Sequence, residues 1–451
     1  MTVGGIAQPA NVAVVGCGHV GLVMSAGLAE LGHKVTGIDR SEALVQKLAK
    51  GEVHVHEPGL PELVGKGLAS GMLSFTTAYE TAVPDADFIF LAVDTPATLG
   101  GAADLRNIRS ATRSIAASLN GKSPVIVNKS TSPIGTGETI AGILQSTLAK
   151  PYRVPRIVSN PEFLRQGRAV HDFFNPDRIV IGARAPEDAH AVAELYAGLE
   201  GPMIITDLRT AEMIKYVANS FLATRVSFIN EISRLCEPLG VDVDEVVSGI
   251  ALDARIGSHF FSPGIGFGGS CLPKDVAALR YMGETFGVAT PVLSAVQEVN
   301  QAQRTGAVRR LRARLGTLEN RTIAVWGVTF KGETEDARDS PAVDVIGLLR
   351  NEGAVIRSYD PVHPESAPEE VRQTYCASAL EAARGADALA ILTDWPEFLK
   401  VPLVQVKAVM NGSVLFDGRN TLSRAEAESV GFAYLAVGRV PRSQRRRETD
   451  A

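Results

Sequence analysis

Short apolar runs that end in glycine, proline or polar residues recur along the first part of the chain. They lie at residues 11–16 (NVAVVG), 34–39 (KVTGID), 87–96 (DFIFLAVDTP), 124–133 (PVIVNKSTSP) and 156–159 (RIVS). Residues 22–33, between the first two runs, have the apolar spacing of a helix. Strand patterns that alternate with helical patterns are typical of parallel sheets in α/β proteins.

The same pattern returns after residue 320. Apolar runs at 321–327 (RTIAVWG), 354–361 (AVIRSYDP), 387–395 (DALAILTDW) and 413–420 (SVLFDGRN) predict a second parallel sheet. Between the two sheets, residues 207–250 and 291–314 have helical spacing. We therefore expect an α/β fold with two Rossmann-like, doubly wound domains joined by a central helical segment. The expected boundaries are 1–205, 206–315 and 316–440, followed by a disordered polar tail at 441–451.

Composition agrees with a globular chain of more than one domain. The 451 residues are 45% hydrophobic and 21% charged, and the net charge of -5 gives no electrostatic basis for binding nucleic acid. The four cysteines, at 17, 236, 271 and 376, have no metal-ligand spacing and no dense disulfide pattern. The first ten residues lack a signal peptide pattern, and no apolar stretch is long enough to span a bilayer. We expect a cytoplasmic protein without a metal.

A glycine-rich turn follows the first predicted strand. Gly16, Gly18 and Gly21 form G-x-G-x-x-G between a strand and a helix, and Asp39 ends the next strand. Such glycines allow a tight turn, close approach to a pyrophosphate and close packing of helix on strand, while the acidic residue binds the ribose hydroxyls. The pattern predicts a dinucleotide site and favours NAD over NADP. His19 and Val20 lie inside this turn.

Residues 262–275 read SPGIGFGGSCLPKD, and their glycines and prolines predict a loop that can press against a ligand. Cys271 is followed by Lys274 and Asp275. A thiol beside an ammonium is a candidate nucleophile, because a nearby cation favours the thiolate. The alternative is a flexible loop with an ordinary free cysteine.

Other candidate residues follow from their positions. Glu162 lies just past a strand end, as a general base or as a charge favouring a helix N-terminus. Lys215 and Asn219 share one helix face and could hold a developing oxyanion, or could face solvent. At the strand ends, turn chemistry is the alternative to cofactor contact for this set: Thr95, Pro96, Lys129, Ser130 and Thr131. The second sheet offers a set suited to a mononucleotide: Phe330, Lys331, Arg338 and Arg419.

These motifs together resemble the UDP-glucose/GDP-mannose dehydrogenase family over nearly the whole chain. The motifs are GCGHVG, VDTP, KST, SNPEFL, EMIKYVANSFLA, DARIG, GFGGSCLPKD, WGVTFK and FDGRN, in the family's order. The resemblance implies a metal-free, NAD-dependent, four-electron oxidation of a sugar-nucleotide alcohol to an acid. It leans towards UDP-glucose as substrate and UDP-glucuronate as product. UDP-N-acetylhexosamines and GDP-mannose stay open as alternatives.

The resemblance also implies roles for individual residues. Cys271 matches the nucleophile, Lys215 and Asn219 the oxyanion site, Asp275 a residue that assists the water or base, and Glu162 the acid/base. Thr131 matches a threonine near the nicotinamide. Lys274 and Arg338 match cofactor contacts. The implied substrate contacts are Glu162, Phe163, Leu164, Lys215, Asn219, Arg255, Phe267, Gly268, Phe330, Lys331 and Arg419.

One of the two arginines, Arg255 or Arg419, would come from a neighbouring subunit, which implies a homodimer or larger assembly. A two-electron hydroxyacid dehydrogenase shares the first sheet but needs neither the GGSC loop nor a second sheet. A non-enzymatic dinucleotide sensor would have no need for the thiol, the lysine and the glutamate. His19 departs from the family, which often has tyrosine there.

Overall fold

The computed structural model describes residues 9–148 and 156–440. The chain divides into two compact units, Met1–Ala218 and Asn219–Ala451, and the division falls inside helix α9 (Leu208–Cys236). The first predicted boundary, at 205/206, lies one residue before the end of the last strand of the first sheet. The second, at 315/316, coincides with the end of helix α12 (Pro291–Leu315). The predicted tail at 441–451 and most of the N-terminal ten residues lie outside the described residues.

The first unit contains an eight-stranded sheet in the order β3-β2-β1-β4-β5-β6-β7-β8. Neighbouring strands are parallel except β6 and β7, which are antiparallel. The strands are β1 (Asn11–Val15), β2 (Lys34–Ile38), β3 (Leu73–Thr76), β4 (Phe88–Leu91), β5 (Val125–Asn128), β6 (Arg156–Ser159), β7 (Ile179–Ala183) and β8 (Met203–Thr206). The order reverses between β1 and β4, where doubly wound sheets bind ligands at the carboxyl ends of their strands.

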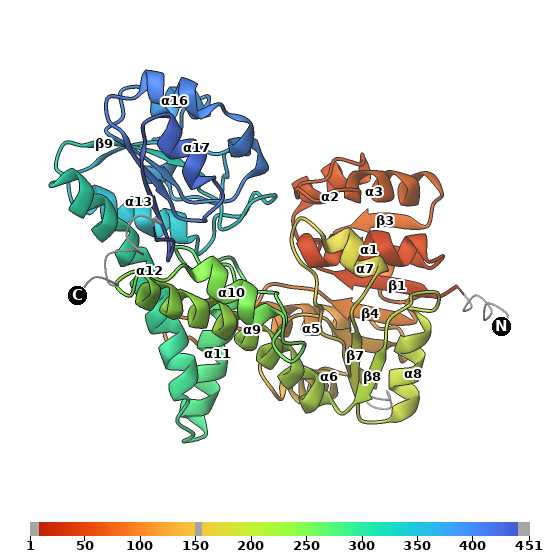
Figure 1. Cartoon of the computed structure of the whole chain (residues 1–451). Helices are drawn as coiled ribbons and strands as arrows, with labels where there is room; N and C mark the ends of the chain where they lie inside the picture. Colours follow the sequence, from red (N-terminus) through yellow and green to blue (C-terminus); the bar gives the residue numbers. More distant parts are fainter. Residues whose placement is uncertain (1–8, 149–155, 441–451) are drawn as a thin grey trace. The chain divides into compact units, whose positions relative to one another are not determined.

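Helices cover both faces of this sheet, and each face has its own core (Figure 1). Val12 and Val14 of β1 belong to one core, and Ala13 and Val15 belong to the other. Alternation along one strand thus explains why the run is apolar throughout. The helices are α1 (His19–Glu30), α2 (Glu42–Ala49), α3 (Leu60–Ala69), α4 (Tyr79–Ala82), α5 (Arg106–Ser118), α6 (Thr136–Thr147), α7 (Ala169–Phe174) and α8 (Pro186–Glu194).

The second unit joins helices to a five-stranded parallel sheet in the order β10-β9-β11-β12-β13. Its first helices are the end of α9, α10 (Val243–Ala251), α11 (Leu272–Thr285) and α12. The strands are β9 (Thr322–Trp326), β10 (Val355–Tyr359), β11 (Ala388–Ile391), β12 (Val414–Asp417) and β13 (Ala433–Ala436). The remaining helices are α13 (Pro341–Asn351), α14 (Glu369–Arg372), α15 (Ala379–Ala383), the 3-10 helix η1 (Pro396–Lys400), α16 (Leu403–Val409) and α17 (Arg424–Ser429).

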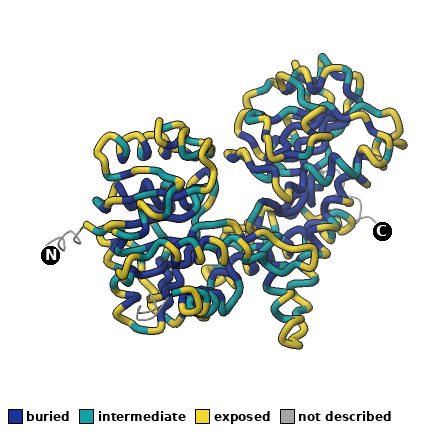
Figure 2. The backbone as a smooth tube through the Cα atoms, turned by 180° about the vertical axis from the view of Figure 1, so that it is seen from behind, coloured by how far each residue is buried: buried dark blue, intermediate teal, exposed yellow. Residues whose placement is uncertain are grey.

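Most strands of the two sheets are buried, as β5, β11 and β12 are throughout, whereas the edge strand β8 is mostly exposed (Figure 2). In β9, Ile323 and Val325 enter one core, whereas Ala324 and Trp326 enter the other. The predicted α/β fold with two Rossmann-like sheets and an intervening helical segment is therefore confirmed. Within the described ranges, every helix is too short or too polar to cross a lipid bilayer.

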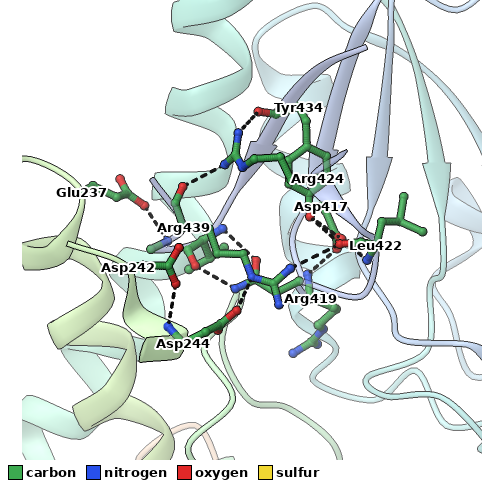
Figure 3. Close-up of polar contacts among 12 residues, drawn as sticks. Glu237, Asp242, Asp244, Asp417, Arg419, Leu422, Arg424, Tyr434 and Arg439 are labelled. Carbon is green, nitrogen blue, oxygen red and sulfur yellow. Dashed lines mark hydrogen bonds and ion pairs between the residues drawn. The ribbon is translucent and has the colours of Figure 1, made fainter. Parts of the chain in front are cut away.

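A polar network fastens the end of the second sheet to the helices of its own unit (Figure 3). The N–H of Gly438 donates to Glu237, at 3.0 Å, and the guanidinium of Arg439 donates to Asp244, at 2.6 Å. Arg424 donates in turn to the carbonyl of Arg439, at 2.9 Å. Glu237 directly follows α9 and Asp244 lies in α10, so these contacts hold both helices against the residues that follow β13.

Candidate active site

The three glycines of the turn, Gly16, Gly18 and Gly21, are each required for a different structural reason. Gly16 has a φ of +96°, and a Cβ there would lie 2.4 Å from the carbonyl oxygen of Ala92. A Cβ on Gly21 would lie 1.8 Å from the carbonyl oxygen of Gly16. A Cβ on Gly18 would meet no protein atom within 4 Å. The first and third glycines therefore serve protein packing, while the second leaves open space of the kind that a pyrophosphate fills.

Asp39 is held in place at the end of β2. Its carboxylate accepts hydrogen bonds from the N–H of Cys17 and the N–H of Ser41, both at 2.9 Å. The Cys17 thiol is buried, and burial together with the charge of Asp39 raises its pKa, so this thiol is an inert filler. The turn, the N-terminus of α1 with Val20, and a fixed acidic group at the next strand end fit the NAD that the sequence predicts.

His19 begins α1 and contacts a carboxylate that the sequence did not single out. Its Nε2 lies 2.9 Å from Oε2 of Glu57, whose side chain is fully buried. Glu57 also accepts hydrogen bonds from the N–H groups of Gly167 and Ala169, at 2.8 and 2.7 Å. This one carboxylate therefore joins the glycine turn to the segment that follows Glu162.

The strand ends next to the turn are tied to each other. The hydroxyl of Thr95 donates to the carbonyl of Thr131, at 2.6 Å. The hydroxyl of Ser130 donates to the carbonyl of Val93, at 2.7 Å, and accepts the N–H of Val93, at 2.9 Å. These contacts fix the backbone at Thr95 and Thr131. The predicted role of both residues at the cofactor stays a prediction.

Glu162 and Lys215 form a buried ion pair. Nζ of Lys215, in α9, lies 3.0 Å from Oε1 of Glu162, and both side chains are nearly withdrawn from water. The other carboxylate oxygen accepts the N–H of Leu164, at 2.6 Å. Burial alone would raise the pKa of Glu162, but the charge and hydrogen bond of Lys215, the N–H of Leu164 and the charge of Lys129 hold it below its ordinary value.

Phe163 lies between two cations. The guanidinium of Arg178 lies 3.7 Å from the ring centroid, and Nζ of Lys215 lies 5.2 Å from it. Cations attract the ring face, so the aromatic side chain helps to hold both groups. The structure thus brings four of the predicted residues together in the first unit: Glu162, Phe163, Leu164 and Lys215.

Cys271 is the residue before the first turn of α11. Its side chain is exposed and in no disulfide with another described cysteine, and its carbonyl accepts the N–H of Asp275, at 2.9 Å. Ser270 Oγ lies 3.8 Å from its Sγ. The backbone N–H groups of a helix N-terminus favour negative charge, so this is a suitable position for a thiolate.

Asp275 connects three of the predicted residues in the second unit. It is 1% exposed and accepts hydrogen bonds from the amide of Asn219, at 2.6 Å, and from the ammonium of Lys274, at 2.5 Å. Asn219 comes from α9 and the other two from α11. A buried carboxylate that retains an adjacent cation and amide can orient a water or accept a proton close to Cys271.

The loop before Cys271 packs directly on the segment after β9. A Cβ on Gly268 would lie 2.2 Å from the carbonyl oxygen of Asp339, and a Cβ on Gly269, whose φ is +84°, would lie 2.8 Å from the ring of Phe330. The side chain of Asn300 holds Phe267 through both its N–H and its carbonyl, at 2.8 and 3.0 Å. Cys271 therefore follows a loop that is fixed on two sides.

The remaining candidate residues of the second unit have partners within that unit. Arg419 donates to the carbonyls of Leu392, Gly266 and Phe330 at 2.9, 2.9 and 3.0 Å. Arg338 pairs with Asp336, and the exposed Arg255 pairs with Asp253. Nζ of Lys331 lies 5.9 Å from the Phe330 ring centroid. Their assignment to substrate or cofactor stays a prediction.

Helix α9 carries both predicted oxyanion residues on one face, since four residues turn a helix by about 400°. Their partners differ. Lys215 pairs with Glu162 in the first unit, whereas Asn219 binds Asp275 in the second. The sequence showed the common face, but the partners come from loops that only the fold brings to the helix.

Sequence reasoning missed another residue on this face of α9. Glu212 is buried, and its carboxylate accepts the N–H groups of Gly135 and Gly137 at the start of α6, at 2.7 and 2.9 Å. Burial raises the pKa of Glu212 to about 7, although these two N–H groups act in the opposite direction. A glutamate one turn before a buried lysine was the available signal, but its partners lie 75 and more residues away.

Comparison with known proteins matches the chain to one family along most of its length. Residues 10–200 match the NAD binding domain of the UDP-glucose/GDP-mannose dehydrogenase family, residues 209–302 its central domain, and residues 324–424 its UDP binding domain. The UDP-glucose 6-dehydrogenase TuaD of Bacillus subtilis is 43% identical over 433 residues, which cover 95% of this chain and 93% of the relative.

Two solved structures are also similar. One is a UDP-glucose dehydrogenase from the archaeon Pyrobaculum islandicum, with a TM-score of 0.88, 37% identity and coverage of 96% of this chain and 99% of that one. The other is a UDP-D-ManNAc dehydrogenase from Pyrococcus horikoshii, with a TM-score of 0.84, 27% identity and coverage of 95% and 99%. The chain therefore belongs to the UDP-glucose/GDP-mannose dehydrogenase family, and its first unit carries that family's NAD-binding domain.

Proposed function

We propose that the protein oxidises the C6 alcohol of UDP-glucose to the acid of UDP-glucuronate through a covalent intermediate on Cys271. The observation that carries this proposal is an exposed thiol at the start of α11, one helical turn before a buried Asp275 that holds Asn219 and Lys274. A two-electron alcohol oxidation needs no thiol, whereas oxidation to the acid uses one to retain the aldehyde. The curated relative at 43% identity supports UDP-glucose as the substrate.

In this proposal, the turn of Gly16, Gly18 and Gly21 together with Asp39 would hold NAD, which would supply the hydride acceptor for each of the two oxidations. Glu162 takes part in removal of the alcohol proton. The Cys271 thiolate then adds to the aldehyde carbon, forming a C–S bond and a thiohemiacetal. Loss of the second hydride converts it to a thioester. Water, oriented by Asp275, breaks the C–S bond, releases the acid and restores the thiol. Lys215 and Asn219 stabilise the negative oxygen in these steps.

Another nucleotide sugar is the alternative substrate. The Pyrococcus structure, similar at 27% identity over 95% of this chain, is a UDP-D-ManNAc dehydrogenase, so this architecture also accommodates an N-acetylated sugar. GDP-mannose is a further possibility because it falls within the family's description. Higher identity and TM-score favour UDP-glucose over both.

The test is the amount of NADH formed from limiting UDP-glucose with excess NAD. Two NADH per UDP-glucose would support the four-electron reaction, and one would show that an aldehyde is released. Cys271→Ala should still bind NAD but form almost no acid, with Cys376→Ala as the matched cysteine control. Normal acid formation by Cys271→Ala would exclude the covalent route. If UDP-glucose gives no NADH, the same assay with UDP-N-acetylmannosamine and GDP-mannose tests the alternatives.

We also propose that two copies of the chain pair through α9. Five apolar residues of this helix are exposed and fall within one stripe: Met213, Val217, Phe221, Phe228 and Leu235. At 100° per residue, the stripe lies about half a turn from Lys215 and Asn219. Exposed apolar stripes of this length favour burial against a partner. Sedimentation should show a dimer that Phe228→Asp weakens, while the control Val404→Asp, at an exposed position of α16, leaves it intact.

We place the reaction in the cytoplasm, because a reducing compartment keeps Cys271 out of disulfides, as the covalent step requires.

A further inference from the structure

Lys129 is a buried lysine to which the proposed chemistry assigns no role. It directly follows β5, and its residue exposure is 7%. Nζ donates to Oδ1 of Asn160, at 3.1 Å, and to the hydroxyl of Tyr196, at 3.4 Å. The sequence made Lys129 a candidate cofactor contact, and in the structure its ammonium donates to these two groups.

The partners of Lys129 are arranged for a cationic donor. The amide nitrogen of Asn160 donates to the carbonyl of Val180, at 2.8 Å, so its oxygen faces Lys129. The hydroxyl of Tyr196 donates to the same oxygen, at 2.6 Å, and so presents its lone pairs to Nζ. Asn160 and Tyr196 are themselves buried. Two buried acceptors that are oriented towards its ammonium distinguish Lys129 from a lysine that merely fills space.

Lys129 and Glu162 line the same cavity. Its volume is about 60 Å³, which is enough for a few water molecules. The charged groups that line it are Lys129, Glu162, Arg165, Asp172, Asp177 and Arg178. Arg165 and Asp172 pair with each other, at 2.5 Å, and Arg178 stacks on Phe163. The charge of Asp177 acts on the pKa values of Arg165 and Arg178, which leaves Glu162 as the anion of this cavity with which Lys129 is coupled.

The coupling is reciprocal. Burial lowers the pKa of Lys129 to about 7, the charge of Glu162 acts against this, and the charge of Lys215 lowers it further. Lys129 in turn is one of the groups that lower the pKa of Glu162. The three side chains come from β5, from the segment after β6 and from α9, and together they form one electrostatic cluster.

We propose that Lys129 is a positioning residue that acts through Glu162: its ammonium keeps the Glu162 carboxylate ionised, so that it stays paired with Lys215 and able to accept a proton. This rests on the proposed roles of Glu162 and Lys215 in the oxidation. A neutral side chain at position 129 leaves one cation rather than two to stabilise the carboxylate. Glu162 then takes up a proton at a higher pH, and the fraction of active enzyme falls in acid.

The test is the pH profile of kcat/KM for Lys129→Met between pH 3.5 and 9, a range that includes the titration of Glu162 below its ordinary value. We expect the acid limb to move up by about one pH unit, because a cation within a few ångströms shifts a carboxyl by this amount or more. The rate should fall about tenfold on the acid side of the limb. Above pH 8 it should approach the wild-type rate, since Lys129 of the wild type has lost its own proton there.

Two control variants separate charge from packing. Tyr196→Phe removes one acceptor but retains the ammonium, so its acid limb should stay in place. Lys122→Met removes an exposed lysine from the other end of the same strand, where it pairs with Asp87, and should change nothing. A profile of unchanged shape for Lys129→Met, or a loss of equal size at every pH, would overturn the proposal.

A second measurement does not depend on activity. The pKa of Lys129 is about 7 in the folded protein and 10.5 ordinarily, so the unfolded chain binds more protons between these values. The wild type should therefore gain stability relative to Lys129→Met as the pH rises from about 7 to 10. Absence of this relative gain would contradict the buried ammonium. If the wild type formed no NADH from any nucleotide sugar, the proposed function would fail while this result still stood.

Discussion

Nζ of Lys215 lies 3.0 Å from Oε1 of Glu162, in an ion pair that water hardly reaches. Removing one partner leaves an uncompensated charge in a buried site, whereas removing both leaves none. Lys215→Met should therefore destabilise the protein by about 3 kcal/mol or more, and Lys215→Met with Glu162→Leu should be more stable than the sum of the single changes.

Urea unfolding of the four proteins at pH 7.5 gives this coupling directly. Additive effects of the two substitutions would show that the pair contributes nothing. Both single variants should also lose activity, because Lys215 is the proposed oxyanion donor and Glu162 the proposed base.

Asp275 holds Asn219 and Lys274 in the first turn of the helix that begins after Cys271, the proposed nucleophile. In Asp275→Asn, a neutral amide replaces the carboxylate that orients water in the proposed hydrolysis. We expect kcat to fall by about 100-fold or more and the thioester to accumulate on Cys271.

Mass spectrometry of the enzyme, quenched during turnover, measures this adduct. A fall in kcat without an adduct would assign Asp275 to an earlier step. Glu352→Gln, which changes a half-buried partner of Arg312 in the same unit, is the matched control and should turn over normally.

Glu212 makes the stability of the first unit depend on pH. Burial raises its pKa from 4.5 to about 7, so between these values the folded state binds more protons than the unfolded state. Stability should therefore be fully retained below about pH 4.5 and fall as the pH rises to 7, by about 3 kcal/mol in total.

Glu212→Gln has no carboxyl group that binds this proton. Its stability relative to the wild type should therefore increase by up to about 3 kcal/mol as the pH rises from 4.5 to 7. Chemical denaturation at pH 4.5, 6 and 7.5 measures the difference, in which groups common to both proteins cancel. A constant difference would show that Glu212 titrates normally.

Gly268 allows the loop before Cys271 to approach the segment after β9. In Gly268→Ala, the new methyl carbon would lie 2.2 Å from the carbonyl oxygen of Asp339 and 2.6 Å from Pro341. A backbone carbonyl cannot relieve such a clash by changing rotamer, as a flexible side chain can. We expect a loss of about 1–3 kcal/mol in stability and a change in the rate at which a thiol reagent labels Cys271.

Gly249→Ala is the control for the same chemical change. Gly249 lies in α10, and a Cβ there would meet nothing within 4 Å. That variant should be stabilised by about 0.5–1 kcal/mol through the helix preference of alanine, with unchanged labelling of Cys271. Equal effects of the two substitutions would exclude the clash.

The patterns that predicted the fold are local. The glycine turn with its flanking strands, and the apolar runs of both sheets, depend on neighbours within about thirty residues, and the structure confirms them. The shared face of Lys215 and Asn219 could also be predicted, because helix periodicity alone determines it.

What the sequence did not show depends on distant contacts. Lys129 looked like a cofactor contact at a strand end, yet its Tyr196 partner is 67 residues away. Glu57 joins His19 to Gly167, 110 residues further along the chain, and lies in a loop with no motif that we recognised. The partners of such buried charges come from distant parts of the chain, so no local spacing of residues predicts them.

The hydrogen bonds of Arg419 mean that the loop before Cys271 is completed late in protein synthesis. The carbonyl of Gly266, five residues before Cys271, accepts one of these hydrogen bonds from a residue 153 positions further along the chain. At about 5–20 residues per second, the ribosome needs roughly 8–30 s to make that stretch. The Cys271 loop therefore gains this support only when the second sheet is nearly complete, and a chain that ends early leaves the thiol on a loop without it.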